Sequence, residues 1–169
     1  VRPVFLEAPH DRRAWECEEE FLLGPSLLVD PMLAGFHERA VYLPEGDWQE
    51  WESSKTHRGG RVIHLTDVPL STLPIFVRSG SLLPLLAEPG TRREPATLEI
   101  LAYGAGPCSG ELFEDDGLTY DSMNPTQRTW HLLNGRPGQE IQVQSDGPFR
   151  GKLFVLPATS SLPGLAGRH

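Results

Sequence analysis

Turn signals recur at short intervals along most of this sequence. They separate short runs of residues, and they are PEGD, RGG, RSG, EPG, GAG, DDG, NGRPG and SDG. The runs between them alternate apolar and polar side chains, as in residues 40–43, 97–102 and 141–144. This alternation is typical of half-buried antiparallel strands, and turns at this spacing are typical of a β-sandwich. With 38% hydrophobic residues in a chain of 169, the sequence predicts a globular, mainly β fold of antiparallel β-sandwich modules.

The first 34 residues have a different pattern. Continuous apolar runs in VRPVFLEAP and LLGPSLLVDPM flank the polar, acidic segment DRRAWECEEEF. Two such runs joined by a segment of helical composition are typical of buried parallel strands with a crossover. We therefore expect a short α/β element whose apolar side chains, without covering neighbours, stay disordered or collapse onto a sandwich. A shortened chain starting near Gly35 should then be more soluble and melt more cooperatively.

The charge and the cysteine and histidine content limit the partners of the chain. The formal net charge is −8, whereas nucleic acids and anionic membranes require a basic face, so a neutral substrate fits better. No apolar stretch is long enough to span a bilayer. Cys17 and Cys108 lie 91 residues apart, with no further cysteines for a metal site, and are expected to be free thiols. The six histidines lack metal-ligand spacing and the glycine clusters lack a phosphate-loop pattern, so we expect neither a metal nor a cofactor.

The most acidic stretch of the chain is GELFEDDGLTYD, where Glu114, Asp115 and Asp116 precede Gly117. Catalytic carboxylates that share one substrate must face it from opposite sides, which neighbours in a chain rarely do. A calcium loop needs alternating rather than consecutive acids. Asp-Gly between apolar runs is a strong hairpin signal, so a tight turn is the favoured interpretation and the role of its acids is left open.

Aromatic side chains offer a second candidate, because aromatic faces suit the apolar face of a sugar ring. Trp48 and Trp51 in DWQEW would point to opposite faces of a strand, so at most one of them could stack on a given sugar. The favoured alternative is one core tryptophan and one at an interface, and the same holds for Trp130. Ser79 and Ser109 are not in nucleophile-elbow motifs.

Three longer motifs carry a resemblance to a known family. They are RPVFLEAPHDRRAWECEEEFLLGPSLLVDPM, then VYLPEGDWQEWESSKTHRGG with PLSTLPIFVRSGSLLPL, and then GELFEDDGLTYD. In this order, over about residues 2 to 121, they resemble the C-terminal region of glycoside hydrolase family 31, the α-glucosidases and α-xylosidases. Two departures are Asp30, where that family usually has alanine, and the missing threonine-glycine after Trp51.

The resemblance implies a division of the chain into successive parts. The expected parts are the end of the catalytic (β/α)8 barrel at 1–34, a proximal C-terminal β-sandwich at 35–87, a linker at 88–95, part of a distal C-terminal β-domain at 96–157, and a tail at 158–169. In the linker, Arg92 and Arg93 are expected to be solvated, with pairing to acids such as Glu114 as the alternative.

The resemblance also implies what this chain does not contain. The two catalytic aspartates of the family lie on barrel strands upstream of the RPVFLE motif, so no residue of this chain matches a catalytic, substrate-binding, cofactor or metal position. A complete barrel takes about 250 residues. The chain is therefore expected to be a C-terminal fragment, non-catalytic on its own, of a retaining α-glycosidase that hydrolyses α-glucosidic or α-xylosidic bonds.

In that enzyme the oligosaccharide or glycoside substrate would bind in the missing barrel, with no cofactor, nucleic acid or membrane involved. The alternative is a stand-alone carbohydrate-binding or structural β-sandwich module. Sugar specificity, compartment and oligomeric state stay open.

Overall fold

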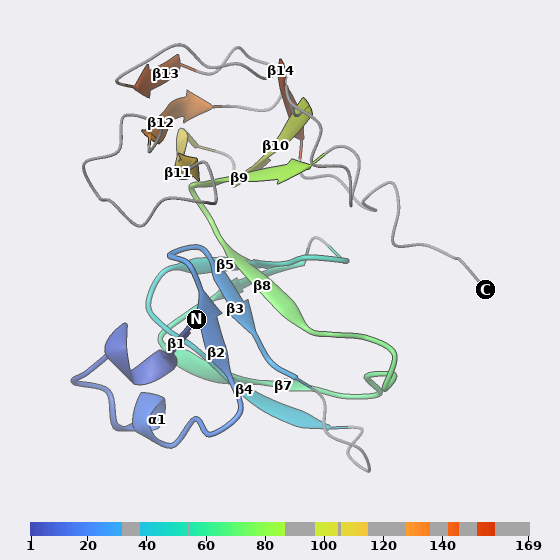
Figure 1. Ribbon diagram of the computed structural model, residues 1–169. Helices are drawn as coiled ribbons and strands as arrows, with labels where there is room; N and C mark the ends of the chain where they lie inside the picture. The colour runs from blue at the N-terminus through green and yellow to red at the C-terminus, as the bar shows by residue number, and fades with distance from the viewer. Residues whose placement is uncertain are drawn as a thin grey trace. The chain divides into compact units, whose positions relative to one another are not determined.

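The computed structural model describes residues 1–31, 38–53, 55–86, 97–104, 106–114, 128–135, 142–145 and 152–157. Its strands and short helices fall into two compact units, and the boundary between them lies at Ser79 and Gly80 (Figure 1). The sequence-based division places boundaries near residue 34 and at 88–95, and it stays a prediction. Each unit is mainly β, as the alternation of apolar and polar residues predicts.

The first unit contains eight strands and two short helices. They are β1 (Arg2–Pro3), the 3-10 helix η1 (Val4–Leu6), α1 (Arg12–Trp15), β2 (Phe21–Leu23), β3 (Leu27–Val29), β4 (Arg39–Leu43), β5 (Asp47–Glu50), β6 (Thr56–Arg58), β7 (Arg61–Leu65) and β8 (Ile75–Arg78). Six strands form one sheet in the order β1-β2-β3-β8-β5-β6, and β4 pairs with β7 in a second sheet.

The predicted parallel arrangement of the first strands is wrong. Strand β2 pairs antiparallel with both β1 and β3, and β3 pairs antiparallel with β8. Only residues 24–26 separate β2 from β3, whereas a parallel pair needs a crossover of a dozen or more residues. Gly24 has φ +63, a conformation that favours glycine in a turn. Residues 1–31 therefore contribute strands to the same sheet as residues 47–78.

One hydrophobic core joins the two sheets of the first unit. Its buried side chains are Val4, Ala14, Leu22, Leu28, Val41, Tyr42, Leu43, Trp48, Ile63 and Phe76. The six-stranded sheet supplies Leu22, Leu28, Trp48 and Phe76. Strands β4 and β7 supply Val41, Tyr42, Leu43 and Ile63. The N-terminal apolar side chains Val4, Leu22 and Leu28 are therefore regular members of this core, and β1, β2 and β3 are strands of its sheet.

Two predicted turns of the first unit, PEGD and RGG, lie against each other. The amide of Gly59 donates to the carbonyl of Gly46 at 2.6 Å, and that of Gly60 donates to Leu43 at 2.8 Å. A Cβ atom at Gly59 would overlap the carbonyl oxygen of Pro44. Glycine is therefore required at residue 59 by the close approach of two backbones.

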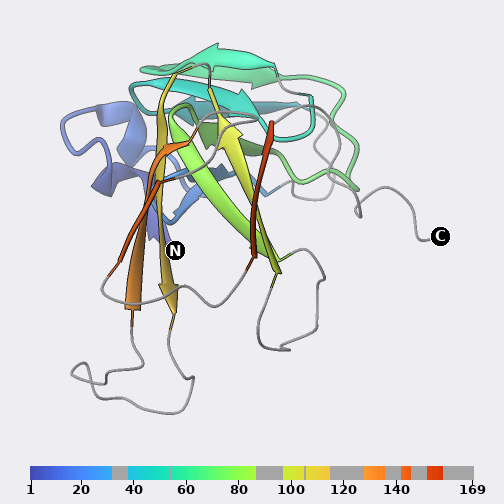
Figure 2. The ribbon, with the colours of Figure 1, turned by 90° about the horizontal axis from the view of Figure 1, so that it is seen from above.

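The described strands of the second unit form one six-stranded sheet. Its strands are β9 (Ser81–Leu86), β10 (Thr97–Tyr103), β11 (Cys108–Glu114), β12 (Arg128–Gly135), β13 (Gln142–Ser145) and β14 (Lys152–Pro157). They lie side by side in the order β13-β12-β11-β9-β10-β14 (Figure 2). Most neighbours are antiparallel as predicted, but β10 and β14 are parallel and β9 meets β11 in a parallel bridge.

The expected linker and the expected acidic turn belong to this part of the chain. Residues 88–95 connect β9 and β10, which are antiparallel neighbours in one sheet. The ladder between β11 and β12 ends with the pair Glu114 and Arg128. Residues 87–96 and 115–127 lie outside the described residues, so the predictions for Arg92, Arg93 and the Asp-Gly turn are not tested.

Candidate functional site

The two tryptophans of the DWQEW motif have different environments in the structure. Trp48 lies on β5 and is 0% exposed. Its indole Nε1 donates to the carbonyl of Pro44 at 2.8 Å, and the guanidinium carbon of Arg78 lies 4.5 Å from its ring centroid. Trp48 is therefore a core residue with a satisfied polar atom.

Trp51, just beyond the end of β5, is half-buried and lines a pocket of about 310 Å³. Three segments of the chain line the pocket: the end of β5 with the residues after it, the end of β7 with the residues after it, and the segment that leads into β8. The lining residues are Glu50, Trp51, Glu52, Ser53, Lys55, His64, Leu65, Thr66, Val68, Thr72, Leu73, Pro74, Ile75 and Phe76. The amide of Trp51 donates to the carbonyl of Ile75 at 2.9 Å, which fixes two of these segments to each other.

Glu50 lines this pocket and contacts three other polar side chains. Its Oε1 lies 2.6 Å from Nε2 of His57 and 4.0 Å from Nζ of Lys55, and its Oε2 accepts a hydrogen bond from the Ser53 hydroxyl. Burial raises the pKa of the Glu50 carboxyl, but the hydrogen bonds from Ser53 and His57 outweigh burial and leave the pKa below its ordinary value. The pocket thus contains a carboxylate that is ionised at neutral pH.

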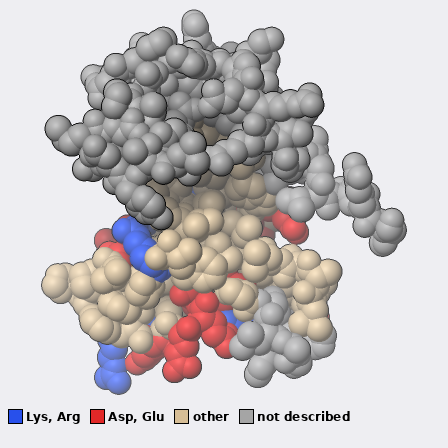
Figure 3. Space-filling model, in the orientation of Figure 1, with Lys and Arg blue, Asp and Glu red and all other residues tan. Residues whose placement is uncertain are grey.

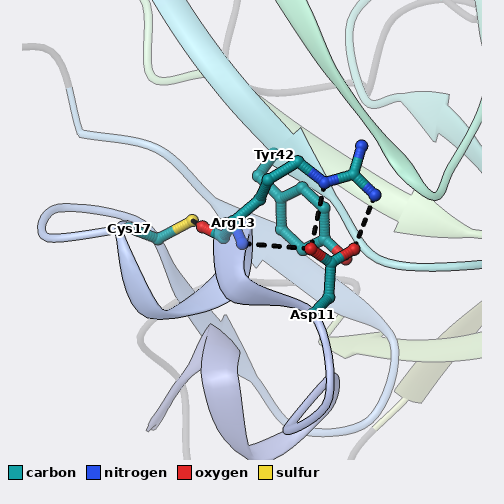
Figure 4. A network of polar contacts seen from close by, with 4 residues as sticks. All are labelled: Asp11, Arg13, Cys17 and Tyr42. Atoms are coloured by element: carbon teal, nitrogen blue, oxygen red, sulfur yellow. Dashed lines mark hydrogen bonds and ion pairs between the residues drawn. The ribbon is translucent and has the colours of Figure 1, made fainter.

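A second group of polar side chains surrounds Tyr42 of β4 (Figure 4). The Tyr42 hydroxyl donates to Asp11 at 2.8 Å, and Arg13 donates to both oxygens of the same carboxylate at 3.0 and 2.6 Å. The hydrogen bonds from Arg13 and then Tyr42 hold the pKa of Asp11 well below its usual range, while burial and Asp11 raise that of Tyr42. Asp11 also accepts from the amide of Arg13 and caps α1. This network fastens α1 to β4 and holds no group poised for proton transfer at neutral pH.

The two cysteines are free, as predicted. The thiol of Cys17 donates to the carbonyl of Arg13 at 3.2 Å, and burial raises its pKa to about 12. Cys108 is buried, and burial raises the pKa of its thiol as well. A thiol that stays protonated is a poor nucleophile, so neither cysteine suits covalent catalysis.

Glu20 has the most strongly raised pKa among the described carboxyls whose pKa is shifted. The residue is 7% exposed, its Oε1 accepts from the amide of Tyr42 at 3.0 Å, and its Oε2 is buried without a hydrogen-bond partner. Burial and the nearby charge of Asp30 raise its pKa from 4.5 to about 7. Because Glu20 and Asp30 are both buried, they do not form a carboxylate pair that a substrate could reach.

Replacing Glu20 with glutamine should remove a pH dependence of stability. The folded chain binds the Glu20 proton more tightly than the unfolded chain does, so this contribution is complete below about pH 4.5 and is lost as the pH rises to about 7. The loss amounts to roughly 3 kcal/mol. Urea unfolding between pH 4 and pH 8 measures it, and Glu16→Gln, at an exposed carboxyl, is the matched control. A Glu20→Gln chain that loses stability over this interval as steeply as the wild type would contradict the assignment.

The remaining candidates do not converge on a site. His57 on β6 is 9% exposed and pairs with Glu50, whereas His10 and His64 are exposed. In the ranges of the chain that are described, no group of three or more His, Cys, Asp or Glu side chains is arranged to hold a metal ion. Across the same ranges, no helix has the length and apolar composition needed to cross a membrane. On the face drawn in Figure 3, acidic side chains gather on the first unit, in agreement with the net charge of −8.

Comparison with known proteins identifies the family of the first unit. Residues 1–83 match the glycosyl hydrolase family 31 C-terminal domain. These residues belong to the C-terminal domain of glycoside hydrolase family 31. The match includes residues 1–34, whose strands lie in the sheet of the first unit.

Curated relatives of this family 31 chain are glycosidases. The chain is 34% identical to neutral alpha-glucosidase AB of Mus musculus over 72% of its own length and 14% of that protein. It is 32% identical to an alpha-xylosidase of Saccharolobus solfataricus, over 72% of the chain and 17% of that protein. The chain therefore spans less than a fifth of the length of these relatives.

Solved structures of the family agree with the fold. The GH31 alpha-xylosidase of Xanthomonas citri superposes with a TM-score of 0.77 at 25% identity, over 99% of this chain and 20% of that one. The GH31 dextranase of Flavobacterium johnsoniae, complexed with glucose, gives a TM-score of 0.71 at 27% identity, over 84% and 18%. The same dextranase has also been solved with isomaltotriose, as a mutant.

Proposed function

We propose that this chain is the C-terminal β region of a retaining α-glycosidase and that it has a structural rather than a catalytic role. The observation that carries the proposal is the family match over residues 1–83, within a chain that covers 14–17% of its glycosidase relatives. The parent enzyme would hydrolyse α-glucosidic or α-xylosidic bonds of an oligosaccharide or glycoside. Its nucleophile and acid/base would be carboxylates of a preceding barrel, about 5–5.5 Å apart.

The chemistry of the described residues is consistent with this division of labour. The described acids with strongly shifted pKa values are either buried, as Glu20 is, or bound in ion pairs within the β unit, as Asp11 is. Retaining hydrolysis needs two carboxyls that face one sugar from opposite sides. The reaction would therefore depend on the barrel, and the β units would stabilise it.

Exposed apolar side chains near the N-terminus suit contact with the rest of such an enzyme. Trp15 stacks on Phe5 with ring centroids 4.4 Å apart, yet Trp15 is 58% and Leu6 is 57% exposed. Large apolar groups that are exposed next to one another often mark a protein interface. The sequence pattern predicted that residues 1–34 are the end of the barrel itself. Because their strands lie in the sheet of the first unit, they would instead carry the surface that meets the barrel.

An assay of residues 1–169 tests the proposal directly. The chain should not hydrolyse aryl α-glucosides or aryl α-xylosides, because binding contacts alone cannot replace a nucleophile and an acid. Turnover that copurifies with the chain would contradict it. The coding sequence upstream of Val1 gives the complementary test: an open frame with two aspartate-bearing barrel strands is expected, and an untranslated sequence would leave a stand-alone module.

A further inference from the structure

We propose that the pocket beside Trp51 binds a glucose residue of an α-linked saccharide. The choice of ligand class rests on the proposed function, while the position of the site rests on the pocket itself. The sequence identifies Trp51 as a candidate sugar-stacking residue, and the structure places it, unlike Trp48, where a ligand can reach it.

The size of the pocket limits the ligand. Its volume of about 310 Å³ is at the lower end of the roughly 300–1,000 Å³ that ligand pockets span. One sugar ring with part of a second fits such a space better than an extended chain does. Because the lining comes from three segments of one β unit, the pocket needs no other part of the chain to form.

The apolar part of the lining suits the carbon-bound hydrogens of a sugar ring. Trp51, Leu73 and Ile75 line the pocket and are only partly buried or exposed, and Phe76 lies fully buried in the core behind them. A pyranose presents one apolar face, which packs on an aromatic or aliphatic surface. These apolar residues would orient the sugar ring without favouring a charged ligand over a neutral one.

The polar part suits hydroxyl groups. Glu50 has a side chain that is 22% exposed and is held by His57 and Ser53, so its orientation is fixed before a ligand arrives. Carboxylates accept strong hydrogen bonds from hydroxyl donors. Thr66 and Thr72 add hydroxyls that both donate and accept. The lining contains two carboxylates, Glu50 and Glu52, and the single ammonium of Lys55, so it disfavours anions and accommodates a neutral polyhydroxyl ligand.

The test is a titration of residues 1–169 with isomaltose and maltose, followed by amide chemical shifts, with the β-linked disaccharide cellobiose for comparison. We expect shift changes that saturate and that cluster at residues 50–55 and 64–76. Trp51→Ala should weaken binding roughly tenfold. Trp15→Ala, at an exposed tryptophan of the same unit outside the pocket, should leave binding unchanged.

The possible results distinguish failure of the binding site from failure of the proposed function. If Trp51→Ala melts at a lower temperature than the wild type, Glu52→Ala at the exposed rim replaces it as the test variant, with the same expected direction. Shifts that are absent, that spread over the surface without saturating, or that survive both variants would overturn the site and leave the proposed function intact. Binding by a chain whose upstream sequence encodes no barrel would instead support the site and overturn the proposed function.

Discussion

Removing residues 1–34 should abolish the cooperative unfolding of the first unit. The deletion takes away β1, β2 and β3, and β3 is one of the two strands that pair with β8; the other, β5, remains. Val4, Leu22, Leu28 and Val29 are at most 5% exposed. Burial of each such side chain contributes roughly 1.5–3 kcal/mol, and four of them approach the about 5–15 kcal/mol by which a whole domain is stable.

The deletion would also leave polar groups without partners. Tyr42 would lose the acceptor for its buried amide, and Arg78 would lose the carboxylate of Glu7, which it contacts at 2.8 Å. The freed edge of β8 would be open to pairing with other chains. We therefore expect the shortened chain to aggregate, the reverse of the improvement in solubility that the sequence pattern predicts.

Hydrogen exchange measures the effect one strand at a time. Amides of β8 should be protected in residues 1–169 and exchange rapidly in residues 35–169. A chain that ends at Ala158, from which the predicted tail is removed, controls for shortening and should keep the protection. If residues 35–169 are monomeric, bind no hydrophobic dye and retain protected β8 amides, the original expectation holds and the N-terminal strands are dispensable.

The parts of the fold that local periodicity encodes were predictable. The alternating pattern predicts β4 and β10, and both are strands, but Val41, Tyr42 and Leu43 are all buried, so both faces of β4 are covered and not one. The same argument separates Trp48 from Trp51 before any coordinates are known. An alternating pattern indicates which residues share a face of a strand. Trp48 is buried because its face of β5 packs against the core.

Strand direction was not predictable from the apolar runs. A continuous apolar run has the same composition in a parallel strand and in a central antiparallel one. The predicted crossover was the segment DRRAWECEEEF, but β1 and β2 on its two sides are antiparallel. Residues 24–26 divide the second apolar run into the antiparallel strands β2 and β3. The Trp51 pocket was hidden for a related reason: its lining joins residues 50–55 to 64–76, and no local pattern reports that these segments meet.

Asp30 shows the limit of motif comparison. In the family that the sequence resembles, alanine is usual at this position, and Asp30 is 0% exposed here. Arg39 compensates for the change: its Nη2 donates to Oδ1 of Asp30 at 2.7 Å and its Nε donates to Oδ2 at 3.2 Å. The two residues are nine positions apart, a spacing that no strand or hairpin rule singles out, so only the fold identifies the pair.

Arg39→Met should therefore destabilise the first unit by about 3–5 kcal/mol, because it leaves the buried carboxylate of Asp30 without its counter-charge. Asp30→Ala should cost less, since the Arg39 side chain is 15% exposed and keeps its ion pair with Glu19. The double variant should be more stable than Arg39→Met alone, because no buried charge remains unpaired. Urea unfolding at neutral pH gives all three values and their coupling.

The matched control for Arg39→Met is Arg12→Met, which makes the same change at an arginine that is 91% exposed and pairs with Glu16 at 3.1 Å. An exposed pair of this kind contributes at most about 1 kcal/mol. The physical difference between the two arginines is the burial of the partner carboxylate, because desolvation makes an unpaired charge costly inside the protein and nearly free at its surface. Equal losses for the two variants, or a double variant that loses the sum of its single changes, would show that Asp30 is accommodated in the core without Arg39.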